Sequence, residues 1–235
     1  KPKPMVEIGP YPIIWHILKL YSHFNFKDFI ICCGYKGYLI KEYFVNYFQH
    51  TSDLTINLKK NSITIHEEKS EDWNVSLIDT GEKTMTGGRL ARVRKFIGNE
   101  TFCFTYGDGL SNVNLNQLVD FHKGEKRLAT LTAVQPPGRF GSLSFKRGKV
   151  LTFKEKPIGD NHWINGGFFV LEPSVLDLIN DDSCSWEEEP MRQLAEMGQL
   201  SAFHHEGFWQ PMDTLRDKIL LNDLWNKNKA PWKLW

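Results

Sequence analysis

The apolar residues of this chain follow two spacings that alternate along its 235 residues. Some segments place them three or four residues apart, as on one face of a helix, and others contain short apolar runs, as in buried strands. Residues 11–21 and 36–48 show the helical spacing, and the apolar run at 28–34 between them ends at a glycine. The start of the chain therefore predicts a helix, a strand and a second helix.

The same alternation continues to residue 134. The pattern predicts two paired strands at 54–58 and 62–66, which turn at Lys59-Lys60-Asn61. The other elements expected in this part are strands at 74–79, 102–106 and 129–134 and helices at 87–97 and 114–122. Strands that alternate with helices favour an α/β fold, in which helices cover both faces of a mostly parallel sheet.

The second half of the chain has a different pattern. Residues 140–153 predict a β-hairpin that turns at Lys146-Arg147-Gly148. A strand at 168–171 follows, and helices are expected at 174–179, 186–197 and 213–225. Because we find no internal repeat or long linker, the chain is most simply one domain over 1–235, with two parts that meet near residue 135.

Composition argues against several classes of partner. The net charge is +1 and no basic block occurs, so nothing favours nucleic acid. We find neither a signal peptide nor an apolar run long enough to span a bilayer, so nothing favours a membrane. The four cysteines include the adjacent Cys32 and Cys33, and their spacing matches neither a zinc site nor a disulfide framework. We therefore expect a reducing, cytoplasmic setting.

Two aspartates stand where a sheet could present them to a ligand. Asp108 lies between two glycines directly after the apolar run 102–106, and Asp213 follows an aromatic segment just before a predicted helix. A carboxylate at the end of a buried strand points into the crevice where α/β sheets bind ligands. The alternatives are ordinary: Asp108 would cap the next helix within a turn, and Asp213 would be a helix N-cap.

Lysines accompany these carboxylates. Lys3 lies in Lys1-Pro2-Lys3-Pro4, where the prolines stiffen the backbone and a fixed ammonium suits a phosphate. Lys156, beside Glu155, ends a predicted strand and could neutralise a phosphate while Glu155 accepts from a hydroxyl. The alternatives are a frayed basic terminus for Lys3 and a solvated hairpin end for Lys156. Two distant aspartates together with lysines are what metal-assisted phosphoryl or nucleotidyl transfer requires, since Mg²⁺ takes one or two carboxylates and completes its shell with water and phosphates.

Two glycine-rich segments complete the candidate site. Residues 84–90 place hydroxyls and exposed amides just before a helix, an arrangement that suits an anion or the edge of a base. The alternative is an ordinary loop with threonine caps. Asn165-Gly166-Gly167 offers an amide side chain and bare backbone, which suit sugar hydroxyls, or else form a simple turn.

The order of these motifs resembles the sugar-1-phosphate nucleotidylyltransferase family from Lys1 to Trp235. The motifs are K-P-K-P-M, T-G-G-R-L, Y-G-D-G, F-x-E-K-P, N-G-G-F-F and W-x-P-M-D-T. Within the family, P-P-G-R-F-G at 136–141 and F-W-Q-P-M-D-T at 208–214 are typical of the cytidylyl branch rather than of its thymidylyl or uridylyl relatives.

The resemblance implies a fold and a reaction. The fold would be a Rossmann-like, mostly parallel mixed sheet flanked by helices, with a small hairpin region on the sugar side and C-terminal helices. Residues 1–135 would bind the nucleotide and 136–235 the sugar. With Mg²⁺, CTP and α-D-glucose 1-phosphate would become CDP-glucose and pyrophosphate. The alternatives are a family member that uses another nucleotide or hexose phosphate, and a catalytically silent homologue that binds sugar nucleotides.

The resemblance also assigns roles to individual residues. Lys3 would contact nucleotide phosphates, Asp108 and Asp213 would hold Mg²⁺, and Lys156 would hold the sugar phosphate. The remaining assignments are Thr84, Gly88 and Arg89 beside the nucleotide, with Arg89 near the base, and Glu155, Asn165 and Gly166 at the glucose hydroxyls.

Family members act in the cytoplasm, assemble as homo-oligomers and supply deoxysugar precursors for surface polysaccharides such as O-antigen. They also open with a strand and a phosphate loop of the type A-G-G-x-G-T-R, whereas this sequence starts at Lys1. That strand belongs in the middle of the sheet, so without it a buried edge would have unpaired backbone groups. We therefore expect the 235 residues alone to be inactive or severely impaired.

Overall fold

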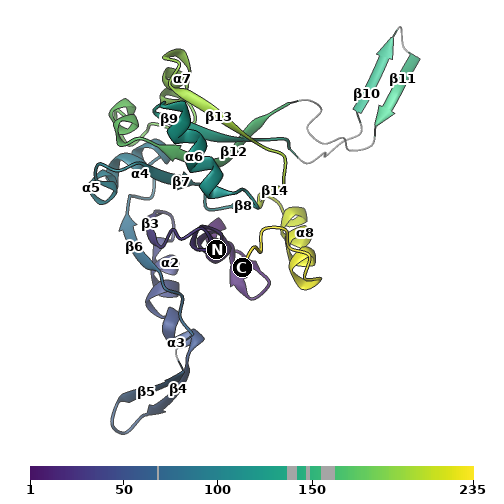
Figure 1. Cartoon of the computed structure of the whole chain (residues 1–235). Helices are drawn as coiled ribbons and strands as arrows, with labels where there is room; N and C mark the ends of the chain where they lie inside the picture. Colours follow the sequence, from purple (N-terminus) through teal and green to yellow (C-terminus); the bar gives the residue numbers. More distant parts are fainter. Residues whose placement is uncertain (68, 137–141, 147–148, 155–161) are drawn as a thin grey trace.

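The structure is a computed structural model of the chain, and it describes residues 1–67, 69–136, 142–146, 149–154 and 162–235 (Figure 1). The largest sheet in these residues contains four strands in the order β13 (Leu200–His205), β9 (Ala129–Val134), β12 (Ile164–Leu171) and β7 (Phe102–Thr105). β13 is parallel to β9, and β12 is antiparallel to both β9 and β7.

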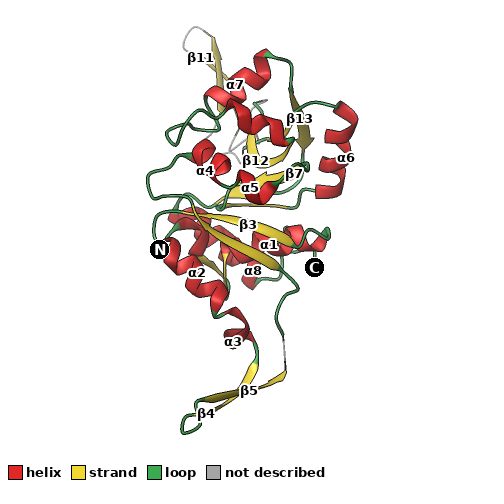
Figure 2. Ribbon diagram, turned by 90° about the vertical axis from the view of Figure 1, so that its left-hand side faces the viewer, coloured by secondary structure: helices red, strands yellow, loops and turns green. Residues whose placement is uncertain are grey.

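A second sheet pairs β3 (Asp28–Cys33) with β6 (Asn74–Asp79) in parallel. Helices α1 (Ile13–His23) and α8 (Leu215–Asn226) lie near it, and α6 (Leu115–Glu125) packs against β13, β9 and β12 (Figures 1 and 2). The other helices are α2 (Gly37–Val45), α3 (Tyr47–Thr51), α4 (Thr86–Arg92), α5 (Arg94–Ile97) and α7 (Glu189–Glu196), with 3₁₀ segments η1 (Lys3–Met5) and η3 (Pro173–Leu178).

The α/β class is as expected, but the sheet is not one mostly parallel sheet. In the described residues the strands form separate sheets, and only the pairs β3–β6 and β13–β9 are parallel. β12 runs antiparallel because the chain enters it from a hairpin rather than through the helical crossover that a parallel strand needs. The expectation of a mostly parallel arrangement was therefore wrong for the largest sheet.

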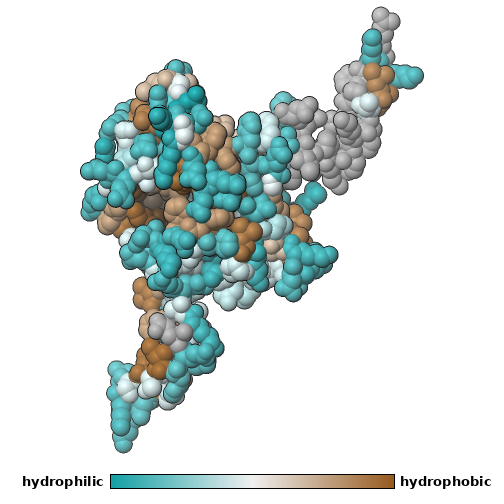
Figure 3. All heavy atoms as spheres, in the orientation of Figure 1, coloured by the Kyte–Doolittle hydropathy of each residue, from teal (hydrophilic) through white to brown (hydrophobic). Residues whose placement is uncertain are grey.

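A groove lies between the two sheets, at β3 and β7. It has a volume of about 1470 Å³, and both strands contribute to its lining. Within the described residues β3 pairs only with β6 and β7 only with β12. Strands must lie about 4.8 Å apart to form a ladder of hydrogen bonds, so the groove keeps the facing edges of β3 and β7 apart. Figure 3 shows the molecule hollowed in this region, with apolar residues in its wall.

Two hairpins project from the body of the molecule (Figure 1). One pairs β4 (Asp53–Asn57) with β5 (Ser62–Glu67), and the other pairs β10 (Ser142–Lys146) with β11 (Lys149–Lys154). Both hairpins were expected from the sequence. Two further pairs of very short strands were not expected from the sequence. They are β1 (Glu7–Ile8) with β2 (Tyr11–Pro12), and β8 (Gly109–Ser111) with β14 (Trp209–Pro211).

The ends of the chain are joined by an aromatic cluster around the buried His16. Its Nε2 lies 2.9 Å from the carbonyl oxygen of Ile8, and its Nδ1 lies 3.3 Å from Nε1 of Trp232. Because an indole N–H can only donate, Nδ1 accepts and Nε2 carries the proton. Trp225 packs edge-on against the same ring, with centroids 4.7 Å apart. This cluster fixes the segment that carries Lys3 to the C-terminal part of the chain.

Candidate active site

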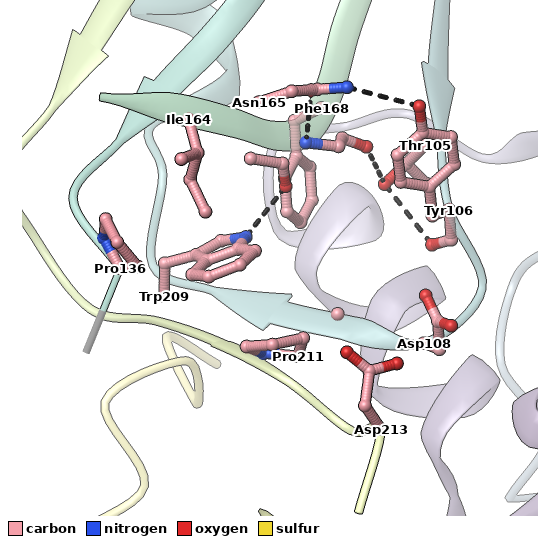
Figure 4. A pocket seen from close by; sticks show the side chains of 13 residues that line it. Thr105, Tyr106, Asp108, Pro136, Ile164, Asn165, Phe168, Trp209, Pro211 and Asp213 are labelled. Atoms are coloured by element: carbon pink, nitrogen blue, oxygen red, sulfur yellow. Dashed lines mark hydrogen bonds between the residues drawn. The ribbon is translucent and has the colours of Figure 1, made fainter. Parts of the chain in front are cut away.

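The pairing of β8 with β14 brings the two aspartates of the candidate site together. Gly109 is opposite Pro211 in this antiparallel pair, and the amide of Met212 donates to the carbonyl oxygen of Asp108 over 2.7 Å. Asp108 and Asp213, more than a hundred residues apart in sequence, therefore flank the same short ladder (Figure 4).

Lys3 lies between the two carboxylates. Its Nζ is 2.7 Å from Oδ1 of Asp213 and 3.2 Å from Oδ2 of Asp108. The hydrogen bond to Asp213 is the largest cause that raises the pKa of Lys3 above its usual value, so the side chain is an ammonium at neutral pH. The three groups predicted separately from the sequence thus meet at one point.

The backbone around Lys3 explains its position. Pro2 precedes the 3₁₀ turn Lys3–Met5, and Pro4 packs on Gly107, where an added Cβ would lie only 2.9 Å from Cγ of the proline. Gly107 therefore permits the close approach that places Lys3 beside Asp108. Lys3 is accordingly not part of a frayed terminus in this structure.

The ordinary alternatives for the aspartates do not hold. The N-cap of α8 is Thr214, which forms a capping box with Asp217, so the Asp213 carboxylate is free to bind Lys3. Asp108 precedes the strand β8 rather than a helix, and its carboxylate also binds Lys3.

The donor set fits a hard divalent cation. Both aspartate side chains are partly exposed, at 30% for Asp108 and 46% for Asp213, and a cationic group already lies between them. Among the residues that the structure describes, no group of three or more His, Cys, Asp or Glu could hold a metal. Mg²⁺ needs only one or two protein carboxylates where phosphates and water supply the other ligands, so the pair Asp108 and Asp213 is sufficient for it.

Two cavities meet at this cluster. The smaller has a volume of about 440 Å³, and Figure 4 shows Asp108 and Asp213 at one end and Trp209 and Ile164 at the other. The larger is the groove between β3 and β7, which Lys3 and Arg89 also line. Asp108 lines both, so the carboxylates lie where a ligand in one cavity would reach a ligand in the other.

Asn165 and Gly166 line the smaller cavity at a bulge in β12. The register between β12 and β9 shifts between Asn165 and Phe169, and bulges of this kind re-aim side chains beside functional sites. Gly167 has φ +76°, a left-handed conformation that favours glycine. The carbonyl oxygen of Gly166 accepts a 2.7 Å hydrogen bond from the indole of Trp209. The structure thus places Asn165 and Gly166, two of the four predicted sugar-side residues, on a cavity wall.

The nucleotide-side residues fall into two groups. Arg89 lines the larger groove and donates to Oγ1 of Thr80 over 2.8 Å. Thr84 and Gly88 are buried and line neither cavity. A Cβ on Gly88 would lie 2.7 Å from the Cα of Asp182, so this glycine is needed for packing of the loop before α7. The nucleotide contacts of Thr84 and Gly88 stay predictions.

Glu155 and Lys156 lie outside the described residues, as do residues 137–141 of the cytidylyl-branch motif. Their assigned roles therefore also stay predictions. Two lining residues were not singled out from the sequence, although each lies inside a motif: Tyr106 in Y-G-D-G and Trp209 in W-x-P-M-D-T. The feature that could have identified both residues from the sequence is an aromatic side chain in the same motif as a candidate carboxylate.

Comparisons with known proteins agree with this arrangement. Residues 1–214 match the family model described as nucleotidyl transferase. Glucose-1-phosphate cytidylyltransferase of Salmonella typhimurium is 59% identical over 236 residues, which cover 100% of this chain and 92% of that protein. The probable glucose-1-phosphate cytidylyltransferase of Bacillus subtilis is 40% identical over 235 residues, which cover 100% of this chain and 92% of that protein.

Solved structures share the fold at lower identity. HddC of Yersinia pseudotuberculosis superposes with a TM-score of 0.70 at 18% identity, over 96% of this chain and 90% of HddC. An apo UDP-glucose pyrophosphorylase superposes with a TM-score of 0.67 at 14% identity, over 97% of this chain and 91% of that one. The family match covers most of the chain and the sequence relatives cover all of it. The chain therefore belongs to the nucleotidyl transferase family.

Proposed function

We propose that this protein transfers a cytidylyl group from CTP to α-D-glucose 1-phosphate, which yields CDP-glucose and pyrophosphate. The observation that carries the proposal is the cluster of Lys3, Asp108 and Asp213 at the junction of two cavities. The 59% identity to a glucose-1-phosphate cytidylyltransferase over the whole chain supports the choice of nucleotide and sugar.

In this proposal the aspartates hold Mg²⁺ and Lys3 binds phosphate. Bound Mg²⁺ supplies positive charge that neutralises the phosphate oxygens during attack at the α-phosphorus. Lys3 carries a positive charge at neutral pH, and the stiff backbone around it keeps its side chain within reach of the same phosphate. Because this chain's charges are preorganised, little reorganisation is needed as charge develops on the phosphate.

The smaller cavity would take the sugar phosphate. Its lining combines the amide of Asn165, the backbone of Gly166 and the indole of Trp209. Amide and carbonyl groups pair with sugar hydroxyls, while an aromatic face covers the apolar face of a sugar ring. Lys156 would hold the phosphate and Glu155 a hydroxyl, as the motif F-x-E-K-P predicts.

The larger groove would take the nucleotide. Arg89 reaches its wall from the start of α4, and Thr84 and Gly88 belong to the same segment. The guanidinium group of Arg89 offers several N–H donors, of which two contact Thr80 and the carbonyl oxygen of Glu82. The remaining donors would meet an acceptor on the base.

The proposal includes a cytoplasmic location and a homo-oligomeric state. All four cysteines are free thiols, which suits a reducing compartment. None of the helices in the described part of the chain is long and apolar enough to cross a membrane. The CDP-glucose formed would supply precursors of deoxysugars for surface polysaccharides such as O-antigen.

A second copy would cover the β4–β5 hairpin. Ile56 is opposite Ile63 on one face, with Leu58 and Ile65 beside them, and their exposed fractions range from 47% to 89%. An isolated two-stranded hairpin is at best marginally stable. Two hairpins packed face to face in opposite directions would bury these residues. The lysines at the tip of each hairpin, Lys59 and Lys60, would then lie near the acidic residues where the other hairpin joins its protein. Figure 3 shows apolar surface along this arm.

The proposed function is tested in a chain preceded by a strand and an A-G-G-x-G-T-R loop, which serves as the wild type in every kinetic test below. Pyrophosphate release is followed from each of the four nucleoside triphosphates with glucose 1-phosphate and Mg²⁺. We expect turnover that needs both glucose 1-phosphate and Mg²⁺ and is fastest with CTP. Faster turnover with another nucleotide would indicate a different member of the family. Binding of CDP-glucose without turnover under any of these conditions would favour the silent homologue.

A further inference from the structure

The phenol of Tyr106 supports the Asn165 side chain on the wall of the sugar-side cavity. The amide Nδ2 of Asn165 donates to the phenol oxygen over 3.2 Å. The Glu187 carboxylate accepts from the hydroxyl of Thr86 over 2.6 Å, and its negative charge acts on the same phenol.

The backbone fixes the direction of these bonds. Oδ1 of Asn165 accepts from the backbone N–H of Gly167 over 2.9 Å, so the group that faces Tyr106 is the amide nitrogen, which can only donate. The phenol oxygen therefore accepts from Asn165. Burial, and after it the Glu187 carboxylate, raises the pKa of Tyr106, so the phenol keeps its proton.

The surroundings leave Tyr106 little freedom. A Cβ on Gly167 would lie 2.5 Å from the Tyr106 ring, so the glycine backbone packs directly on it. The ring also meets Phe104 and Phe169 edge-on, with centroids 5.6 and 5.8 Å away. The backbone N–H of Tyr106 donates to the carbonyl oxygen of Gly167 over 3.2 Å. The phenol is therefore a fixed support for Asn165.

We propose that Tyr106 is a positioning residue that sets the orientation of the Asn165 amide toward the sugar phosphate. With one N–H of Asn165 held by Tyr106 and its oxygen held by Gly167, the second N–H and the second lone pair have fixed directions. A sugar hydroxyl then meets one donor and one acceptor in constant places, which binds it without the entropy cost of ordering the amide. The inference rests on the proposed function, because it needs the smaller cavity to hold the sugar.

The test compares Tyr106→Phe, Asn165→Ala and the double variant with the wild-type protein in the pyrophosphate assay. Loss of the phenol leaves one N–H of Asn165 without its support, so we expect the KM for glucose 1-phosphate to rise about tenfold, the effect of one misplaced hydrogen bond. The kcat and the KM for CTP should stay within about twofold. The double variant should resemble Asn165→Ala, because Tyr106 acts only through that amide.

The control is Tyr38→Phe, which removes an exposed phenol in α2 and should leave all constants unchanged. An unchanged KM for glucose 1-phosphate in Tyr106→Phe would overturn the inference, as would additive effects in the double variant or an equal rise in both KM values. A wild-type protein without turnover would instead refute the proposed function. Calorimetric titration of glucose 1-phosphate would then still decide the inference, by the affinity ratio between wild type and Tyr106→Phe.

Discussion

Lys3 shows what a single residue contributes to this site. Its ammonium occupies the position between Asp108 and Asp213 that a divalent cation would take, with both carboxylates within 3.2 Å. We expect the ammonium to leave this position as Mg²⁺ enters and to bind the nucleotide phosphates that accompany the ion.

At the same scale, His16 predicts how stability depends on pH. Burial lowers the pKa of His16 to about 4, whereas the unfolded chain has a histidine pKa of about 6.5. Between these values the unfolded state binds the proton and the folded state does not, so stability falls as the pH decreases. The expected loss from His16 is about 2 kcal/mol between pH 7 and pH 5.

Urea unfolding of the wild type and of His16→Gln at both pH values checks this prediction. The variant should lose about 2 kcal/mol less than the wild type over the interval, because glutamine does not titrate. Comparing the two proteins removes the contribution of His205, whose pKa is also lowered by burial. Equal losses in the two proteins would show that His16 is not the cause.

At the scale of elements, the site depends on how short segments pack. η1 brings Lys3 to Asp108 only because Pro4 lies against Gly107. Gly107→Ala would set a methyl group 2.9 Å from Cγ of Pro4, so the turn must shift and carry Lys3 away from the carboxylates. We expect at least a tenfold loss of kcat with CTP, since misplacement by about 1 Å can cost about a hundredfold.

The matched control is Gly124→Ala in α6, where an added Cβ has nothing within 4 Å. It should keep wild-type kcat and gain slightly in thermal stability, because alanine favours helices. If Gly107→Ala turned over as fast as this control, the packing of Pro4 would have no part in placing Lys3.

The local sequence pattern predicted where helices and strands lie better than it predicted which strands pair with each other. β6 and β9 begin and end at the residues expected, because each is a continuous apolar or alternating run. β14 has three residues and no such run, so it exists only through its pairing with β8 about a hundred residues earlier. For the same reason the sequence indicated Asp108 and Asp213 as candidates but not that Lys3 would bridge them.

At the scale of the whole molecule, the exposed β4–β5 arm predicts self-association. Ile63→Lys places a charge at the centre of its apolar face, so sedimentation should show a smaller species than the wild type. Thr64→Lys adds the same charge to the opposite, polar face and should leave the assembly intact. Identical sedimentation of all three proteins would exclude this face from the interface.

The central claim is that Asp108 and Asp213 share one divalent ion, and the most direct measurement is the anomalous diffraction of Mn²⁺ in crystals grown with CTP. The account predicts a single strong peak within coordination distance of both carboxylates, with the Lys3 ammonium moved onto phosphate oxygens. A peak bound elsewhere, with Lys3 still bridging the two aspartates, would contradict it.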